Sequence, residues 1–407
     1  MQEELLVFDL NDLLGEEVFG LPGFLTRLFS FAEEYGISGN VWQHYIVYRL
    51  LLDENPYSLR AELGRTTGTL AALARRDIEV IADYFDPEFL ENNCPIAAEI
   101  AAYTPMSPAG SLMAKRVRNL TGILAGLGRP AEFLDALTEE YALRGAGQMG
   151  AFDAFTFLAE GGKASLHPVP AVDRRGLGHL VGYERQKDEL IANTAAFLKG
   201  RGGNDVLLYG DAGTGKSSAV KALINVFPGK KLKLIEVNRD RYRDIPLLLD
   251  MLAPRGFFCI LFLDDLSFEE SETDYKYLKA FLEGGLRRRP PHIAVYATSN
   301  RGHLVAEQFS DRQDMTYTGD VHRSETLEEK LSLAARFGLK VFFPAPDGEA
   351  FLEIARSLRD RAGLALSDER LESLLKQWQL AGGRRSGRMA EQFIRALAAE
   401  TPAEQEQ

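Results

Sequence analysis

One eight-residue segment constrains this chain more than any other part of its sequence. It fits the pattern G-x-x-x-x-G-K-[ST] at every fixed position and reads Gly210-Asp211-Ala212-Gly213-Thr214-Gly215-Lys216-Ser217. Residues 206–209 form a short apolar run typical of a buried strand, and residues 218–224 have the composition of a helix. A strand, a glycine-rich turn and a helix in this order point several backbone N–H groups at one phosphate. The sequence therefore predicts a phosphate-binding loop.

The predicted loop supplies side chains as well as backbone N–H groups. Lys216 is expected to reach the outer phosphates of a nucleotide, and the Ser217 hydroxyl is expected to contact Mg²⁺. The nucleotide-binding residues predicted from the loop are Asp211, Ala212, Gly213, Thr214, Gly215, Lys216, Ser217 and Ser218. Many kinds of enzyme use this motif, so it does not say what the nucleotide drives.

A second segment, residues 260–265, is an apolar strand that ends in two adjacent carboxylates, Asp264 and Asp265. At the carboxyl end of such a strand, Asp264 can reach the Mg²⁺ next to Ser217. Asp265 would then lie near the third phosphate, where it could polarise an attacking water. Buried strands often end in Asp, so this pattern alone indicates little. It becomes informative here because it follows a phosphate loop.

Composition describes an ordinary globular protein. The chain has 407 residues, of which 45% are hydrophobic and 26% charged, and its length predicts two or three domains. Two cysteines and six scattered histidines show no disulfide framework and no metal-ligand spacing. The acidic start is unlike a signal peptide, and no apolar run is long enough to span a bilayer. We expect a cytoplasmic protein with no membrane segment.

The net charge of −12 is unevenly distributed. Residues 1–170 hold 12 Lys and Arg against 24 Asp and Glu, whereas the rest of the chain holds 35 of each. An acidic amino-terminal part is repelled by the phosphates of nucleic acids, so a nucleic-acid partner is allowed but not favoured. The simplest interpretation of this acidity is a solvated surface that favours solubility.

The chain changes character near residue 167. Apolar residues spaced three and four apart predict a helical N-terminal domain over 1–165. His167-Pro168-Val169-Pro170 disfavours a helix and suits an extended linker. Strands and helices then alternate, which predicts an α/β core over 171–346 with a parallel five-stranded sheet. The expected strands are 206–209, 232–237, 257–263, 293–297 and 340–343, and three helices follow near 348–362, 367–380 and 387–399.

Residues 173–400 resemble an AAA+ ATPase module, and the likeness extends beyond the phosphate loop and Asp264. Residues 178–186 resemble the segment that packs on adenine. Residues 296–300 resemble sensor 1, a strand that ends in Asn. Residues 331–338 resemble the arginine-finger segment, and residues 386–390 resemble sensor 2 at the start of a lid helix.

This resemblance implies a P-loop NTPase fold with a helical lid over 347–400, with ATP or ADP and Mg²⁺ as ligands. It places Val181 and Gly182 beside adenine, and Asn300 beside the hydrolytic water. Arg336 would be the finger offered to a neighbouring copy, and Arg388 the lid residue that senses phosphate loss. The implied assembly is a homo-oligomer, either a ring or an open ring.

Four further segments are similar to a bacterial AAA+ group classed as a domain of unknown function, in which a helical segment precedes the ATPase module. They are residues 264–269, 279–285, 297–301 and 329–333. This narrower match covers roughly residues 145–400 and implies no biological role.

Two departures from the AAA+ pattern bear on function. Asp265 stands where most modules carry Glu, so either the water lies closer or another acid, such as Glu269, contributes. Helicase loaders resemble this Asp-Asp form, and we therefore expect Asp265 to be active. The loop 238–244 lacks the aromatic-apolar-Gly triplet with which protein-threading relatives grip a polypeptide, and this disfavours an unfoldase.

Other arginines have simpler interpretations. The run 287–289 before two prolines is interpreted as a solvated turn, and Arg384 and Arg385 as helix-entry charges. Arg301 directly follows the Asn of sensor 1 and is a rival to Arg336 as the finger.

Three classes of function stay open at this point. The first is an ATPase that remodels or loads a protein partner through the acidic helical domain. The second is a DNA-associated ATPase of the loader or branch-migration type. The third is a nucleotide-gated switch or scaffold with little turnover. Charge favours the first over the second.

Overall fold

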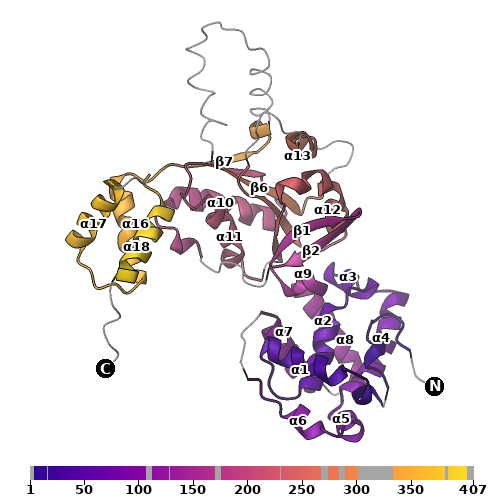
Figure 1. Ribbon diagram of the computed structural model, residues 1–407. Helices are drawn as coiled ribbons and strands as arrows, with labels where there is room; N and C mark the ends of the chain where they lie inside the picture. Colours follow the sequence, from indigo (N-terminus) through magenta and orange to yellow (C-terminus); the bar gives the residue numbers. More distant parts are fainter. Residues whose placement is uncertain are drawn as a thin grey trace, which may run out of the picture.

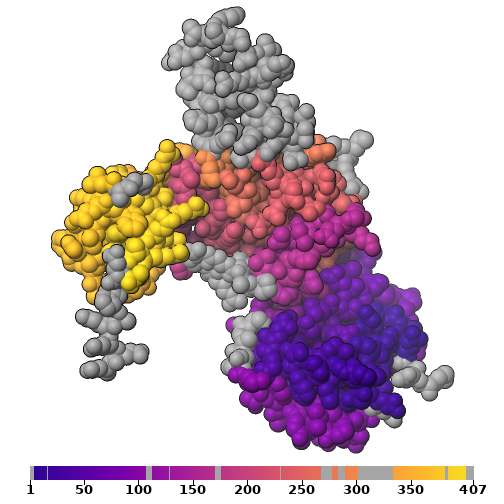
Figure 2. All heavy atoms as spheres, viewed as in Figure 1, coloured from indigo at the N-terminus to yellow at the C-terminus, as the bar shows by residue number. Residues whose placement is uncertain are grey.

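The computed structural model describes residues 4–15, 17–106, 112–127, 129–169, 176–229, 231–266, 274–283, 289–300, 333–380 and 384–400. Within these residues the chain forms a helical part, a part built on one sheet, and a small helical lid, in this order (Figure 1). Figure 2 shows the sheet part between the other two, with the lid on one side and the helical part on another.

The helical part packs around buried aromatic and aliphatic side chains. Its helices in the described residues are α1 (Phe24–Tyr35), α2 (Val41–Leu52), α3 (Pro56–Glu62), α4 (Thr69–Phe85), α5 (Pro87–Asn93), α6 (Ala97–Ala101), α7 (Leu112–Ala125), α8 (Pro130–Arg144) and α9 (Gly147–Ala151). The side chains of Asn40 and Asn55 accept hydrogen bonds from N–H groups at the starts of α2 and α3. Trp42 and Tyr141 are fully buried in the shared core, as the helical spacing of apolar residues predicted.

The sheet part contains seven strands in the order β2-β1-β4-β5-β6-β3-β7. They are β1 (Ala154–Glu160), β2 (Lys163–Pro168), β3 (Val206–Gly210), β4 (Leu232–Glu236), β5 (Phe258–Leu263), β6 (Ile293–Ser299) and β7 (Leu339–Phe343). Each pair of neighbours is parallel except β1 and β2, which are antiparallel. The five predicted strands are present, each within two residues of its expected bounds.

The prediction of five strands is wrong because β1 and β2 add a hairpin at the sheet edge. In β1, Phe155, Phe157 and Ala159 are buried, and this short period-two pattern was missed beside a long helical sequence. Gly161 and Gly162 have φ of 56° and 79°, the left-handed values that a two-residue hairpin turn requires.

The hairpin also corrects the expected boundary at residue 165 and the expected linker at 167–170. His167 and Pro168 pair with β1 and form the end of β2. Proline is tolerated there because β2 is an edge strand, whose outer N–H groups need no partner in the sheet. The helices of the N-terminal part end at Ala151, and residues 154–168 belong to the sheet.

Helices cover both faces of the sheet, because successive strand residues point to opposite sides. On one face, Leu208, Ile260 and Tyr296 pack against α10 (Glu184–Leu198) and α11 (Lys216–Val226). On the other face, Leu207 and Leu261 pack against α12 (Ile245–Leu252) and α13 (Asp274–Glu283). Short 3-10 turns at Leu177–His179 and Arg239–Asp244 precede α10 and α12.

The lid comprises α16 (Gly348–Arg361), α17 (Asp368–Leu380) and α18 (Gly387–Glu400), close to the predicted bounds. It has a core of its own, formed by Phe351, Leu371 and Phe393 among others. Figure 1 shows the lid beside the end of the sheet part that carries α10 and α11. In the described part of the chain, every helix is too short or too polar to cross a membrane.

Candidate functional site

A pocket of about 480 Å³ lies where β3, β5 and β6 end, between α11 and the lid. Ligands of open parallel sheets bind at this edge, outside the carboxyl ends of the strands. The predicted site residues that line it are Val181, Ala212, Gly213, Thr214, Gly215, Lys216, Ser217, Ser218, Asp264, Asp265, Asn300 and Arg388. Gly182, Asp211 and Arg336 are not among its described lining residues.

The phosphate loop runs from β3 to the first turn of α11. Gly213 and Gly215 have φ of 76° and 90°, which side-chain-bearing residues rarely adopt. A Cβ atom at Gly215 would overlap Leu180, so the loop backbone lies hard against the segment before α10. Since α11 begins at Lys216, its first N–H groups have no partner within the helix and lie at the pocket.

Lys216 is buried beside the loop that precedes it. Its Nζ donates hydrogen bonds to the carbonyl oxygens of Gly210 (3.0 Å) and Asp211 (2.6 Å). Burial lowers the pKa of the Lys216 ammonium, while the carboxylates of Asp211, Asp265 and Asp264 oppose that shift. The Asp211 carboxylate accepts a hydrogen bond from the Ala345 N–H at 3.0 Å and ties the loop to the segment after β7.

Two carboxylates follow β5, and each has a defined partner in the pocket. Oδ1 of Asp264 accepts hydrogen bonds from the hydroxyls of Ser217 and Thr298, both at 2.6 Å. Oδ1 of Asp265 accepts a hydrogen bond from Nδ2 of Asn300 at 2.7 Å. The two pairs predicted from the sequence, Ser217 with Asp264 and Asp265 with Asn300, are thus brought together.

Thr298 is a site residue that the sequence reasoning missed. Its hydroxyl donates to Asp264 and accepts a hydrogen bond from the backbone N–H of Asp265 at 2.9 Å. The Thr298 carbonyl also accepts from the N–H of Leu266 at 2.6 Å. Thr298 lies two residues before Asn300, and a polar side chain near the end of a mostly apolar strand was the signal that could have identified it.

The backbone of Asp265 has φ of 54°, in the left-handed region. Among residues with a side chain, Asp and Asn enter this region most readily. The turn after β5 is therefore compatible with Asp at this position, and the short side chain still reaches Asn300.

The lid closes one side of the pocket through α18 and α16. The N–H of Arg388 lies 3.4 Å from the carbonyl oxygen of Gly213, and Ser386 packs against the same glycine. Arg361 at the end of α16 donates to the carbonyl oxygens of Gly178 (2.7 Å) and His179 (3.0 Å), which precede Val181. The lid thereby contacts both the phosphate loop and the segment expected beside adenine.

Comparison with known families shows which protein family this chain belongs to. Residues 150–401 match the family described as "Protein of unknown function (DUF815)". The chain belongs to this family. The match spans the sheet part and the lid, and it confirms the resemblance to an AAA+ group of unknown function. A search of curated proteins finds no match for this family member.

Comparison with solved structures finds likenesses that cover little more than half of this chain. The family member is 18% identical to the Thermotoga maritima RuvB Holliday junction branch migration motor, with a TM-score of 0.37. The alignment covers 55% of this chain and 64% of the motor's chain, which is less than two thirds of the motor. The FIGL-1 AAA domain in complex with ADP is 17% identical (TM-score 0.39, covering 56% and 75%). C. elegans PCH-2 is 15% identical (TM-score 0.35, covering 56% and 66%).

Arg336 lies away from this pocket, on an exposed turn just before β7. Its N–H bonds to the carbonyl oxygen of Leu333 at 3.1 Å. Arg384 and Arg385 do not line the pocket either, among the described residues. Glu269, Arg287, Arg288 and Arg301 lie outside the described residues.

The donor set suits a nucleotide with a hard divalent cation. Backbone N–H groups of the loop and the Lys216 ammonium can bind phosphate oxygens. The hydroxyl of Ser217 and the carboxylate of Asp264 are oxygen donors 2.6 Å apart, the kind of ligand that Mg²⁺ prefers. Among the described residues, no group of three or more His, Cys, Asp and Glu side chains forms a site for a metal bound by protein alone.

Proposed function

We propose that this family member is a Mg²⁺-dependent ATPase of the AAA+ type that remodels or loads a protein partner. The observation that carries the proposal is the clustering of three elements in one pocket: the phosphate loop, the Ser217–Asp264 contact and the Asp265–Asn300 contact. A fold of this kind serves many chemistries, so the function is inferred from the residues of the site.

The contacts of five pocket residues support a role for each in this proposal. Mg²⁺ held by Ser217 and Asp264 would offset the negative charge of the phosphates. Lys216, which now donates to two carbonyl oxygens, would exchange them for oxygens of the outer phosphates. The Asp265 carboxylate would orient the attacking water and accept its proton, with Asn300 holding that carboxylate in place.

Arg336 and Arg388 lie outside the phosphate loop, and each is proposed to interact with the phosphates of a bound nucleotide. Arg388 lines the pocket from the lid and would report phosphate loss to α18. Arg336 is exposed and outside its own chain's pocket, as expected of a finger that completes the site of a neighbouring copy. This role requires a homo-oligomer with head-to-tail contacts, such as a ring or an open ring.

The partner is proposed to be a protein that contacts the helical part. The whole net charge of −12 belongs to residues 1–170, which disfavours binding to a phosphate backbone. Residues 239–244 form a 3-10 turn with Tyr242 buried, so this loop offers no exposed aromatic residue for gripping a threaded chain.

The test is steady-state ATP hydrolysis by the full chain, with and without Mg²⁺ and with and without duplex DNA at one stated salt concentration. We expect Mg²⁺-dependent turnover that DNA leaves unchanged. Lys216→Ala should abolish this turnover, whereas the matched control Lys199→Ala, an exposed residue after α10, should retain it. Absence of hydrolysis in the wild type would contradict the ATPase proposal, and strong stimulation by DNA would contradict the choice of a protein partner.

A further inference from the structure

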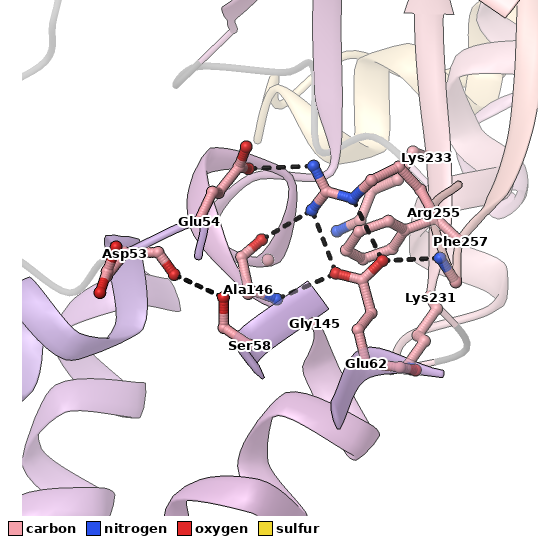
Figure 3. Close-up of polar contacts among 12 residues, drawn as sticks. Asp53, Glu54, Ser58, Glu62, Gly145, Ala146, Lys231, Lys233, Arg255 and Phe257 are labelled. Carbon is pink, nitrogen blue, oxygen red and sulfur yellow. Dashed lines mark hydrogen bonds and ion pairs between the residues drawn. The ribbon is translucent and has the colours of Figure 1, made fainter. Parts of the chain in front are cut away.

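The helical part and the sheet part meet in a joint built around the Glu62 carboxylate (Figure 3). The Glu62 side chain is 0% exposed and forms an ion pair with Arg255 at 3.0 Å. Its two oxygens also accept hydrogen bonds from the N–H groups of Ala146 (3.2 Å) and Gly256 (2.6 Å). A charge this deeply buried is tolerated only when it is fully paired, so these contacts fix how the two parts meet.

Side chains and backbone pack closely around the Glu62 carboxylate, so the joint leaves little room for the two parts to move against each other. Gly145 has φ of 84°, and a Cβ atom there would overlap the ring of Phe257. The Arg255 guanidinium lies 5.2 Å from the centre of the same ring. Lys231, labelled near Phe257 in Figure 3, donates a hydrogen bond to the Glu62 carbonyl oxygen at 3.0 Å.

Beside the joint lies a cleft of about 310 Å³, between α7, α8 and α9 on one side and the end of α11 with the start of β4 on the other. Five cationic side chains line it: Lys115, Arg116, Arg144, Lys231 and Lys233. Among the described residues of its lining, Asp153 is the one acidic residue. Three of these cations come from residues 1–170, where only 12 Lys and Arg face 24 acidic residues. An otherwise acidic part thus presents positive charge to this cleft.

The positive charges of the cleft are incompletely balanced. Lys233 pairs with Asp153 at 2.8 Å, and Arg116 and Arg144 share Glu140 at 2.6 Å and 3.4 Å. Five cations therefore face two carboxylates. Beside them Arg255 pairs with two carboxylates, Glu54 and Glu62, which offsets one more positive charge and leaves a surplus of two.

Burial makes this surplus costly. The side chains of Arg116 and Lys233 are 1% and 3% exposed. Burial lowers the pKa of the Lys233 ammonium, the Asp153 carboxylate opposes that shift, and the nearby Arg116 charge adds to it. Lys231 also carries backbone strain, because its φ is 54° although it is not a glycine. Strained residues of this kind cluster at ligand-binding positions.

We propose that this cleft is a second binding site, specific for a small anion that carries one or two phosphate groups. A phosphate monoester carries about two negative charges at neutral pH, which matches the surplus of positive charge. The volume lies at the lower end of the range for small-molecule sites and suits a small ligand enclosed between two parts of the chain. Lysine and arginine together are the residues that recognise phosphate oxygens.

The position of the cleft links it to the nucleotide pocket through one helix. The first residues of α11, Lys216 and Ser217, line the nucleotide pocket, and the later residues Ile224 and Asn225 line the cleft. The two sites therefore lie at opposite ends of the same helix, and an anion in the cleft contacts the element that carries the phosphate loop.

The experiment is calorimetric titration of the full chain with pyrophosphate. The nucleotide pocket is first filled with a non-hydrolysable ATP analogue and equimolar Mg²⁺, so that the pocket cannot account for the signal. We expect binding of one pyrophosphate per chain. Malonate, a dicarboxylate with fewer acceptor oxygens and less charge, should bind at least about tenfold more weakly.

The decisive variant is Lys115→Gln combined with Lys231→Asn, because Asn tolerates the left-handed backbone of residue 231. This double variant should weaken pyrophosphate binding at least about tenfold, because the loss of even one hydrogen bond to a charged group lowers affinity by about that factor. The matched control, Lys163→Gln with Lys199→Gln, removes two exposed lysines away from the cleft and should bind like the wild type.

Absence of pyrophosphate binding in the wild type would overturn the proposal, as would equal binding by the decisive variant or equal affinity for malonate. Should the double variant unfold, the single change Lys115→Gln at an exposed position of α7 carries the same test. Pyrophosphate binding that survives in Lys216→Ala and fails in the cleft variant supports the second site even where the ATPase proposal fails.

Discussion

The Thr298 hydroxyl donates a hydrogen bond to Oδ1 of Asp264 at 2.6 Å, while its oxygen accepts one from the N–H of Asp265 at 2.9 Å. One buried side chain on β6 thus contacts both residues that directly follow β5, the carboxylate of Asp264 and the backbone of Asp265. Thr298 is 2% exposed, so water cannot replace it in this role. Thr298 does not itself line the pocket, yet it contacts both the Asp264 carboxylate proposed to bind Mg²⁺ and the backbone of Asp265, whose carboxylate is proposed to orient water.

We predict that Thr298→Val, which keeps the shape and removes the hydroxyl, lowers the rate of ATP hydrolysis by about tenfold or more, as is usual for residues that orient metal ligands. It should also raise the Mg²⁺ concentration needed for half-maximal activity, because Asp264 loses a donor that orients it. Thr298→Ser restores the hydroxyl and should recover both quantities. A Val variant with the wild-type Mg²⁺ dependence would contradict this positioning role.

Asp265→Asn should bind ATP like the wild type but hydrolyse it about 10²–10⁴-fold more slowly, because the amide cannot accept a proton from water. Asn also suits the left-handed backbone, so the fold should be preserved. Nucleotide binding by calorimetry and single-turnover hydrolysis measure the two effects separately. Normal turnover by Asp265→Asn would show that the catalytic acid lies elsewhere, with Glu269 the next candidate.

Asp265→Glu tests why this chain departs from the usual Glu. The longer side chain must occupy a left-handed backbone position and would misplace the carboxylate relative to Asn300. We expect a lower hydrolysis rate than the wild type even though the carboxylate is kept. An equal or faster rate would show that neither the backbone nor the reach to Asn300 selects Asp here.

Arg255→Met should destabilise the chain by about 3–5 kcal/mol, because it strands the buried charge of Glu62. Combining it with Glu62→Gln should cost less than the sum of the two single changes, since no charge is then left unpaired. Denaturant unfolding monitored by fluorescence gives both values. The control Lys376→Ala breaks an exposed pair with Glu372 and should change stability little. Strict additivity would contradict the role of the pair in the joint.

Local patterns were sufficient to predict most of the sheet and, in the pocket, the phosphate loop and the two carboxylates after β5, whereas Val181, Asn300 and Arg388 were placed there only by the family resemblance. The loop 210–217 and the strand ending at Asp264 have short-range signatures with a physical cause, and parallel strands bring their carboxyl ends together. The hairpin of β1 and β2 was missed because its period-two pattern covers only a few residues next to long helical segments.

Two other features depend on contacts that no local pattern reveals. Thr298 acts through hydrogen bonds to the two residues that follow a neighbouring strand, 33 and 34 positions away in sequence. The Glu62–Arg255 pair joins residues 193 positions apart, and its partners become visible only when the two parts are packed together. The same packing creates the cationic cleft, whose lining comes from elements of both parts.

The most direct test of a shared ATPase site is the hydrolysis rate of a mixture of two inactive variants, Asp265→Asn and Arg336→Ala. Each subunit type lacks what the other keeps, so a site with an intact Asp265 regains activity when its neighbour supplies an intact Arg336. Random head-to-tail mixing of equal amounts should restore about a quarter of the wild-type rate. A mixture no faster than the average of the two variants measured alone would contradict an active site shared between neighbouring subunits.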